Sequence, residues 1–141
     1  MIELIFIIVI LAVLAAFAIP KLAATRDDAR IATIAQETMT GATEISAYAV
    51  SRGMTQSTLS AMSNAVSALI GQGYATENGT DLTVQAGSVN DCLHLKIEGQ
   101  GTNTEVIKIE FTGSGGDCDK LQRLIDQNAF PIPLRGNRIS F

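Results

Sequence analysis

The first twenty residues of the chain contain an unbroken run of apolar positions, from Leu4 to Ile19. Met1 and Ile2 precede it, and Glu3 is the only charged side chain in this stretch. A helix rises 1.5 Å per residue, so twenty residues span about 30 Å, the thickness of the hydrocarbon core of a bilayer. The run therefore predicts a helix that is apolar on every side and long enough to cross a membrane.

From Lys21 to Arg52 the apolar residues recur at steps of three and four, which is typical of an amphipathic helix. This stripe consists of Ile31, Ile34, Ala35, Thr38, Ala42, Ile45 and Ala49. The stretch contains no Pro, and Gly53 follows it in the position that commonly ends a helix. We predict one long helix from the N-terminus to about Arg52, whose second half needs a domain packed along one face.

Residues 55–70 repeat the helical pattern over a shorter length. Their apolar stripe consists of Leu59, Met62, Val66, Leu69 and Ile70. Ser57 is a suitable N-cap, and Gly71-Gln72-Gly73 ends the segment. We therefore predict a second, short helix over residues 55–70.

Beyond Gly73 the pattern alternates with a period of two, which indicates β-strands. We predict strands over Asp81–Gln85, Cys92–Glu98 and Glu105–Phe111, with residues 99–103 joining the last two as a hairpin. The predicted fold class is α+β, with the long helix packed on a small antiparallel β-sheet.

The C-terminal part predicts shorter elements. Residues 113–116 form a Gly-rich loop, and Asp117 is a candidate cap for a short helix whose inward residues are Leu121, Leu124 and Ile125. Arg138–Phe141 is a candidate edge strand. Pro131 and Pro133 exclude a central strand from their own stretch.

Length and charge limit the classes of protein that fit this pattern. The 141 residues suit one ordinary domain. All ten Lys and Arg residues lie beyond residue 20, yet the net charge is −4, which argues against a nucleic-acid binder that neutralises phosphates. We expect a domain over residues 21–141, of the composition typical of soluble proteins, attached to the apolar segment 1–20.

The apolar segment has two simple interpretations, a secretory signal peptide and a plain membrane anchor. A secretory signal peptide has a basic start and a small-residue cleavage site, whereas here Pro20-Lys21-Leu22 comes directly after the run. A plain membrane anchor fits by length. Glu3 then either sits at the headgroup interface, stabilised by the helix dipole, or has a function inside the membrane or an assembly.

The segment resembles the N-terminus of mature type IV pilins and of their relatives, the pseudopilins of type II secretion. The matching features are Ile2-Glu3-Leu4, the long apolar run, Leu14-Ala15-Ala16 and Ala18-Ile19-Pro20. The resemblance covers about thirty residues. It implies a precursor cut by a prepilin peptidase, methylation of the new terminus and storage in the bacterial inner membrane. Pilus assembly machinery then extracts the subunit into an extracellular helical filament, a pilus or fimbrium.

The resemblance also implies a role for each part of the segment. Glu3 sets the register by pairing with the terminal ammonium of an adjacent subunit, and Pro20 marks a helix break. The filament core is formed by Leu4, Ile5, Phe6, Ile7, Ile8, Val9, Ile10, Leu11, Val13, Leu14, Phe17 and Ile19. Polar contacts between subunits come from Lys21, Arg26, Asp27, Asp28 and Arg30.

The N-terminus differs from the usual pattern of the family in two ways. Two further residues, usually led by Phe, precede the position matched by Met1, so we expect residues ahead of Met1 in the mature protein. Ala12 stands where many members have Gly, and Ala favours the helix that some members lose between this position and Pro20.

Cys92 and Cys118 are the only cysteines, and no C-x-x-C or His/Cys cluster suggests zinc. A pilin-like N-terminus places the domain outside the cytoplasmic membrane, where disulfides persist. Many type IV pilins have one C-terminal loop closed by a disulfide, and Cys92–Cys118 resembles it. Two buried free thiols are the alternative.

The remaining candidates for chemistry are weak. His94 alternates with Leu93 and Leu95, which places it on the solvent side of a strand without a second His. No Ser lies in a G-x-S-x-G or S-x-x-K context, Asp117 and Asp119 are too few for a calcium site, and Asn78-Gly79-Thr80 is a common glycosylation pattern. We expect no enzyme activity, cofactor or metal ion.

Lys120, Arg123, Arg135 and Arg138 give the C-terminal part a positive surplus. This is either a solvated face or a patch for an acidic neighbouring subunit or an extracellular polyanion such as DNA. Together with the resemblance, the sequence predicts a pilin that polymerises with itself. The alternatives are a pseudopilin of a secretion or DNA-uptake apparatus and a membrane-anchored binding module.

Overall fold

A computed structural model describes residues 1–135 of the chain. It divides into two compact units, Met1–Arg30 and the part that begins at Ile31. The first unit is helical from Ile2 onward, and the second unit contains the sheet and the remaining helices. The predicted edge strand Arg138–Phe141 lies outside the described residues.

Helix α1 (Ile2–Arg52) is continuous and contributes to both units, as the long helix predicted from the sequence. Every residue of its predicted apolar stripe from Ile31 to Ala49 is buried, and Gly41 lies buried among them. The N–H of Gly53 donates to the carbonyl of Ala49 at 2.8 Å, and Gly53 has a φ of 68°. Glycine adopts this backbone conformation without a steric penalty, which explains the end of the helix.

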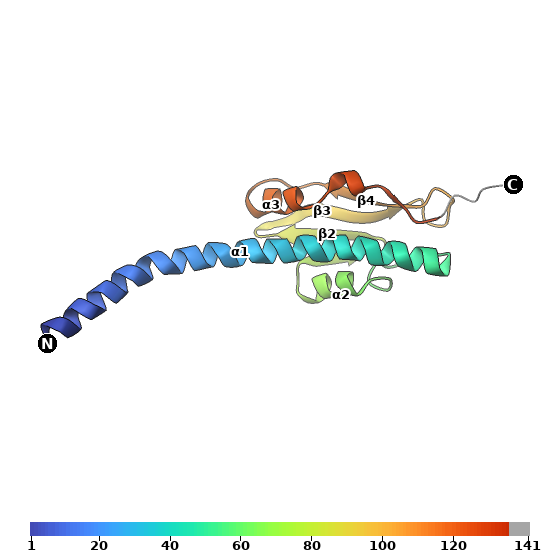
Figure 1. Ribbon diagram of the computed structural model, residues 1–141. Helices are drawn as coiled ribbons and strands as arrows, with labels where there is room; N and C mark the ends of the chain where they lie inside the picture. Colours follow the sequence, from blue (N-terminus) through green and yellow to red (C-terminus); the bar gives the residue numbers. More distant parts are fainter. Residues whose placement is uncertain (136–141) are drawn as a thin grey trace. The chain divides into compact units, whose positions relative to one another are not determined.

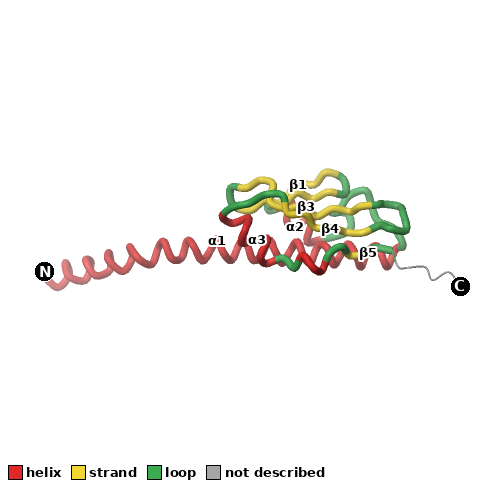
Figure 2. Tube along the Cα trace, turned by 90° about the horizontal axis from the view of Figure 1, so that it is seen from above, coloured by secondary structure: helices red, strands yellow, loops and turns green. Residues whose placement is uncertain are grey.

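The second unit contains one antiparallel sheet with the strand order β1-β2-β3-β4-β5 (Figure 2). The strands are β1 (Ala75–Asn78), β2 (Asp81–Ala86), β3 (Val89–Glu98), β4 (Val106–Phe111) and β5 (Ile132–Pro133). Alternate side chains of the three long strands face inward and are buried. The observed fold is therefore the predicted α+β arrangement of a long helix and a small antiparallel sheet.

One hydrophobic core joins the second half of α1 to the inner face of the sheet. Helix α2 (Asn64–Gly71) packs beside β1, and α3 (Gly116–Leu124) packs against β2 and β3 (Figure 1). A short 3-10 turn, η1 (Gln127–Ala129), leads to β5. Helix α2 approaches α1 closely at Gly41, where a Cβ would lie 2.9 Å from Cγ2 of Val66. The missing side chain of Gly41 makes this approach possible.

The predicted helix over residues 55–70 is wrong in its first half, because α2 begins only at Asn64. The N-cap is Ser63, not Ser57: its backbone is extended, and its hydroxyl accepts the N–H of Val66 at 3.1 Å. Upstream, the N–H of Ser60 donates to the carboxylate of Glu77 at 2.7 Å. The backbone N–H of Ser60 is therefore used outside a helix. Leu59 and Met62 of the predicted apolar stripe are nevertheless buried, as expected.

The strands differ from the prediction in number and length. Strand β1 was not predicted, because Ala75 is its only buried residue and no apolar alternation marks it. Strand β3 begins at Val89 instead of Cys92, and a register shift between β2 and β3 leaves extra residues in β3 at positions 90–92. A bulge of this kind breaks the alternation, which hides the first part of the strand from a pattern of period two.

Helix α3 exists as predicted but differs in two details. Its N-cap position is Gly115, whose N–H donates to the carboxylate of Asp119 at 2.7 Å, so Asp117 is not the cap. Leu121 and Ile125 are buried as expected, whereas Leu124 is 55% exposed. Leu124 is the last residue of the helix, where the chain turns into an extended conformation at Ile125.

Candidate functional site

The first twenty residues present an apolar helical surface within the first unit. All twelve predicted filament-core side chains, from Leu4 to Ile19, are between 43% and 75% exposed. An 18-residue window of α1 has a mean hydropathy of 3.1, and none of it is buried within the chain. Among residues 1–135, α1 is the one helix long and apolar enough to cross a membrane. A surface of this size is unfavourable in water and requires lipid or protein around it.

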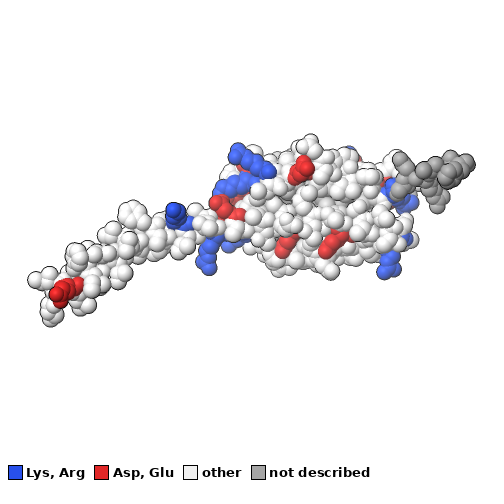
Figure 3. All heavy atoms as spheres, viewed as in Figure 1, with Lys and Arg blue, Asp and Glu red and all other residues white. Residues whose placement is uncertain are grey.

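Glu3 is the one charged side chain on this surface. Figure 3 shows the segment as an uncharged surface with an acidic group near its N-terminal end. Glu3 lies in the first turn of α1, where the positive end of the helix dipole stabilises a carboxylate. An ionised carboxylate surrounded by lipid or protein needs a cation or hydrogen-bond donors as well. A carboxylate at this position therefore needs a cationic or hydrogen-bonding partner.

The expected helix break at Pro20 is not observed, because α1 continues through this residue. Proline cannot donate to the carbonyl of Ala16, and its ring crowds the preceding turn, so one hydrogen bond of the helix is lost. The neighbouring alanines favour helix strongly enough to continue it. Figure 1 shows that α1 curves within the first unit, as expected for a helix that contains a proline.

The charged segment after Pro20 lies on the surface of the helix. Of the five residues predicted to contact other subunits, the structure pairs Arg30 with Asp27, with Nη1 and Oδ1 4.0 Å apart. Both side chains are more than half exposed, so the pair contributes little stability. Lys21, Arg26 and Asp28 are also exposed. The structure thus presents charges of both signs on the helix that follows the apolar segment.

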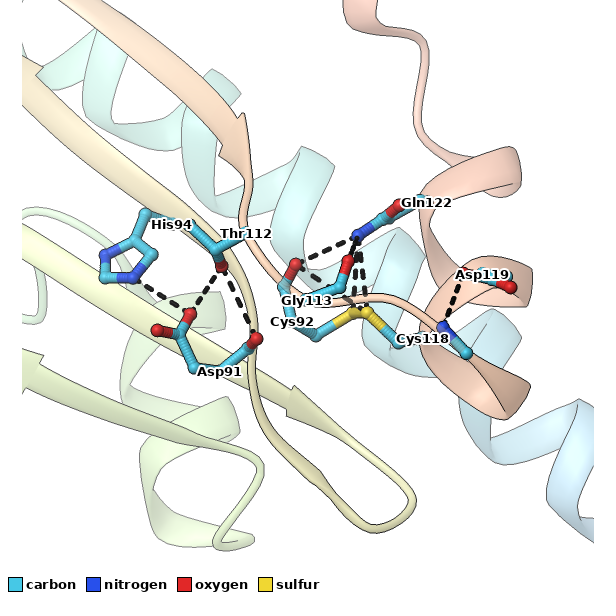
Figure 4. Close-up of a disulfide and its surroundings, with 9 residues drawn as sticks. Asp91, Cys92, His94, Thr112, Gly113, Cys118, Asp119 and Gln122 are labelled. Carbon is cyan, nitrogen blue, oxygen red and sulfur yellow. Dashed lines mark hydrogen bonds and ion pairs between the residues drawn. A yellow bond between two sulfur atoms is a disulfide. The ribbon is translucent and has the colours of Figure 1, made fainter.

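The predicted disulfide joins Cys92 of β3 to Cys118 of α3, with the two Cα atoms 5.5 Å apart. Both cysteines are fully buried. The side-chain amide of Gln122 covers the bridge: its Nε2 donates to the carbonyls of Cys92 and Gly113 at 3.0 and 2.8 Å (Figure 4). The same nitrogen lies 3.3 Å from Sγ of Cys118. No pattern in the sequence indicated this role for Gln122.

A buried carboxylate fixes the C-terminal segment. Glu105 is 1% exposed, and it accepts hydrogen bonds from Nε of Arg135 at 2.9 Å and from the hydroxyl of Thr55. The backbone adds a further link, since the N–H of Leu134 donates to the carbonyl of Glu105 at 2.9 Å. Glu105 therefore ties the chain after β5 to the loop that follows α1. Three residues so distant in sequence give no local pattern, and sequence reasoning missed them.

Replacing Arg135 with methionine is expected to lower the free energy of unfolding by about 1–3 kcal/mol. The substitution leaves Glu105 buried with fewer partners, while the partial exposure of Arg135 limits the loss. Urea unfolding of the full chain in detergent, followed by tyrosine fluorescence, measures the change. The matched control is Arg123→Met on the exposed surface of α3, which should change the free energy by less than about 0.5 kcal/mol. Equal effects of both substitutions would contradict this role of Glu105.

Carboxylates of the chain itself neutralise much of the positive charge of the predicted C-terminal basic patch. Arg135 binds Glu105, and Nζ of Lys120 lies 3.3 Å from Oδ1 of Asp117. Arg123 is exposed, and Arg138 lies outside the described residues. Within residues 1–135 no group of three or more His, Cys, Asp or Glu side chains is arranged to hold a metal ion. The described part of the patch therefore offers little net charge to a polyanion.

His94 lies on the outer face of the sheet, as predicted, but between two carboxylates. Its Nδ1 is 2.7 Å from Oδ1 of Asp81, and its Nε2 is 3.0 Å from Oδ1 of Asp91. The partners come from the neighbouring strand β2 and from β3 itself. The alternation of apolar residues predicted the face of the sheet but gave no sign of the two partners.

No family model matches this chain, and no curated protein and no solved structure matches it either.

Proposed function

We propose that the chain is a pilin, a structural subunit that polymerises through residues 1–20 of α1 into a helical filament of the type IV pilus kind. The observation that supports this function is the uninterrupted apolar surface of that segment, none of which is buried within the chain. A helix that is apolar on every side requires an apolar environment on every side. A membrane supplies that environment to the single subunit, and a bundle of identical helices supplies it to the polymer.

Exchange of lipid for neighbouring subunits keeps the apolar surface buried throughout assembly. The side chains of the segment are mostly Ile, Leu, Val, Ala and Phe, which pack closely in a helical bundle. No hydrophobic surface has to enter water at any stage. The contact joins different faces of identical subunits, and such heterologous contacts produce an open helical fibre when the rotation does not close.

Glu3 sets the register of the subunits in this proposal. Its carboxylate pairs with the terminal ammonium of an adjacent subunit, which removes two unpaired charges from the apolar bundle. A buried ion pair contributes modest net stability because both groups lose water. A sliding subunit, however, separates the two charges within the apolar core, so the pair selects one axial position.

The charged residues of segment 21–30 continue the contact outside the apolar core. Lys21 and Arg26 precede Asp27 and Asp28 on the helix, and Arg30 follows them, so neighbouring copies can form ion pairs of both polarities. The second unit then forms the outer shell of the filament. Before assembly the subunit resides in the inner membrane, and assembly machinery moves it to the cell exterior.

The test is to shear cells that produce the full chain and to examine the released material by negative-stain electron microscopy. The proposal expects thin filaments that contain this polypeptide, identified by mass spectrometry and by labelling with an antibody against residues 31–135. A pseudopilin would build only a short periplasmic fibre, so shearing would release no filaments from the cell surface. A membrane-anchored binding module would yield no filaments under any condition and would remain in the membrane fraction as a monomer.

A further inference from the structure

The outer face of the sheet contains a histidine with a carboxylate on each ring nitrogen. Oδ1 of Asp81 lies 2.7 Å from Nδ1 of His94, and Oδ1 of Asp91 lies 3.0 Å from Nε2. A neutral imidazole has one N–H donor, whereas the imidazolium has two. Two ionised carboxylates on opposite nitrogens can both be satisfied only by the imidazolium. The geometry therefore selects the charged form of His94.

Asp91 lies in the bulge of β3, at the place where the register between β2 and β3 shifts. Extra residues at a bulge interrupt the backbone ladder, so local order there depends more on side-chain contacts. Two contacts hold the carboxylate of Asp91: the hydroxyl of Thr112, just after β4, donates to it, and His94 donates from β3 (Figure 4). The Thr112 hydroxyl also lies 3.4 Å from the backbone carbonyl of Asp91. Cys92 follows Asp91 directly, so the same bulge contains one end of the buried disulfide.

The other charged groups near His94 balance one another. Glu110 of β4 lies opposite His94 in the sheet, and its carboxylate binds Nζ of Lys96 at 2.7 Å. Lys96 also contacts Glu98 of β3 at 3.4 Å, and the carboxylate of Glu98 binds Nζ of Lys108 on β4 at 2.5 Å, so two lysines match the two carboxylates. On β2, the residue opposite His94 is the neutral Thr83. Asp81 and Asp91 are thus the carboxylates that bind the imidazolium itself.

We propose that His94 acts as a pH-sensitive clamp, which holds the bulge at residues 90–92 of β3 against β2 while its ring carries two protons. When His94 loses a proton, one ring nitrogen presents a lone pair to a carboxylate, and that contact changes from attraction to repulsion. The bulge then opens locally, and solvent reaches the disulfide between Cys92 and Cys118. This device is independent of polymerisation and operates in the single subunit.

The direction of the pH effect follows from the charges. Partial burial opposes protonation of His94, but the hydrogen bonds and negative charges of Asp81 and Asp91 outweigh it, so the pKa of His94 is raised above its ordinary value. The pKa of Asp91 is lowered, mainly by the hydrogen bond from the Thr112 hydroxyl and further by His94, so Asp91 stays ionised at neutral pH. A raised pKa of His94 stabilises the folded bulge below about pH 6.5, the ordinary value for histidine. This stabilisation is lost as the pH rises through the raised pKa of the folded protein.

A first experiment measures the protonation of the ring directly. His94 is the single histidine of the chain, so the imidazole ¹⁵N signals of the full chain in detergent micelles need no assignment. We expect both nitrogens to be protonated at pH 6.5 and the midpoint of the titration to lie above 6.5. Asp91→Asn and Asp81→Asn should each lower the midpoint, whereas Asp126→Asn, a carboxylate outside the cluster, should leave it unchanged. A midpoint at or below 6.5, or one unaffected by Asp81→Asn and Asp91→Asn, would overturn the clamp.

A second experiment measures opening of the bulge by its consequence for the disulfide. The rate of reduction by a phosphine is compared between the unaltered chain and His94→Gln at each pH, because the ratio cancels the pH dependence of the reagent. At pH 5.5 we expect the disulfide of the unaltered chain to be reduced about two- to tenfold more slowly, because two partly exposed ion pairs contribute modest stability. At pH 9.5 the two rates should converge. A ratio that is the same at both pH values would overturn the proposal, since a purely structural effect of the substitution would not depend on pH.

Discussion

Replacement of both cysteines by serine is expected to lower the free energy of unfolding of the second unit by roughly 3–4 kcal/mol. The bridge joins positions 26 residues apart, and this separation sets the entropy that the unfolded chain regains when the bridge is lost. Both sulfurs are fully buried, so the serine hydroxyls would also have to find hydrogen-bond partners inside the protein. Urea unfolding in detergent, monitored by the fluorescence of Tyr48 and Tyr74, measures the loss.

Two comparisons separate the contribution of the bridge from that of its surroundings. Gln122→Met removes the amide that donates to the carbonyls of Cys92 and Gly113 but keeps the bridge, so it should cost less, about 1–2 kcal/mol. Cys92→Ala with Cys118→Ala removes the bridge without introducing hydroxyl groups. A loss below about 1 kcal/mol for this alanine pair would show that the covalent link contributes little, and that the packing of β3 on α3 suffices.

Most of the core could be predicted from the sequence because burial largely follows from the spacing of apolar residues, with Leu124 as an exception. The stripe from Ile31 to Ala49 requires only the helical repeat and a domain on one side, and all of its members are buried. The same holds for Leu93 and Leu95, whose alternation with His94 indicated the inner face of β3. Even in residues 55–63, where the predicted helix is absent, the apolar positions Leu59 and Met62 were correctly placed in the core.

Two errors in the predicted elements have different causes, and the first involves hydrogen bonds between residues distant in sequence. The carboxylate of Glu77 takes both the N–H and the hydroxyl of Ser60, which keeps the chain before α2 out of a helix. Strand β1 owes its place to pairing with β2 across the turn that begins at Asn78-Gly79. That dipeptide is a strong hairpin signal, and its use as a turn marker would have predicted the strand.

The candidate sites show the same contrast between features that are local in the sequence and contacts between distant residues. An apolar run with one carboxylate was enough to identify the segment 1–20 as an apolar helix. The single pair of cysteines, together with the resemblance to pilins, was enough to expect the disulfide. Glu105 with Arg135 and His94 with Asp81 are contacts between strands or loops, and no spacing along the chain reveals them. Arg135 is an example: the sequence suggests a surface charge, whereas the structure pairs this residue with the buried carboxylate of Glu105.

Glu3→Gln is expected to reduce the yield of filaments by at least about tenfold while the protein remains folded and inserted in the membrane. Glutamine has nearly the shape of glutamate but carries no charge, so in the proposed filament the terminal ammonium of the adjacent subunit would be left unpaired in the apolar bundle. Breaking one side of a buried ion pair costs about 3–5 kcal/mol, and each 1.4 kcal/mol corresponds to a factor of ten in association. Sheared filaments, quantified by immunoblot and counted by electron microscopy, give the yield.

The matched control is Asp126→Asn, which removes a carboxylate from the exposed loop before η1 and should leave the yield unchanged. Glu3→Asp keeps the charge on a shorter side chain and should give an intermediate yield, because the ion pair must then stretch. Membrane fractionation and formation of the Cys92–Cys118 disulfide confirm that each variant is made and folded. If Glu3→Gln assembles as well as the unaltered chain, the carboxylate does not set the register. The apolar surface of α1 alone must then determine how the subunits align. A mutation that changes the shape of that surface would in that case reduce the yield of filaments.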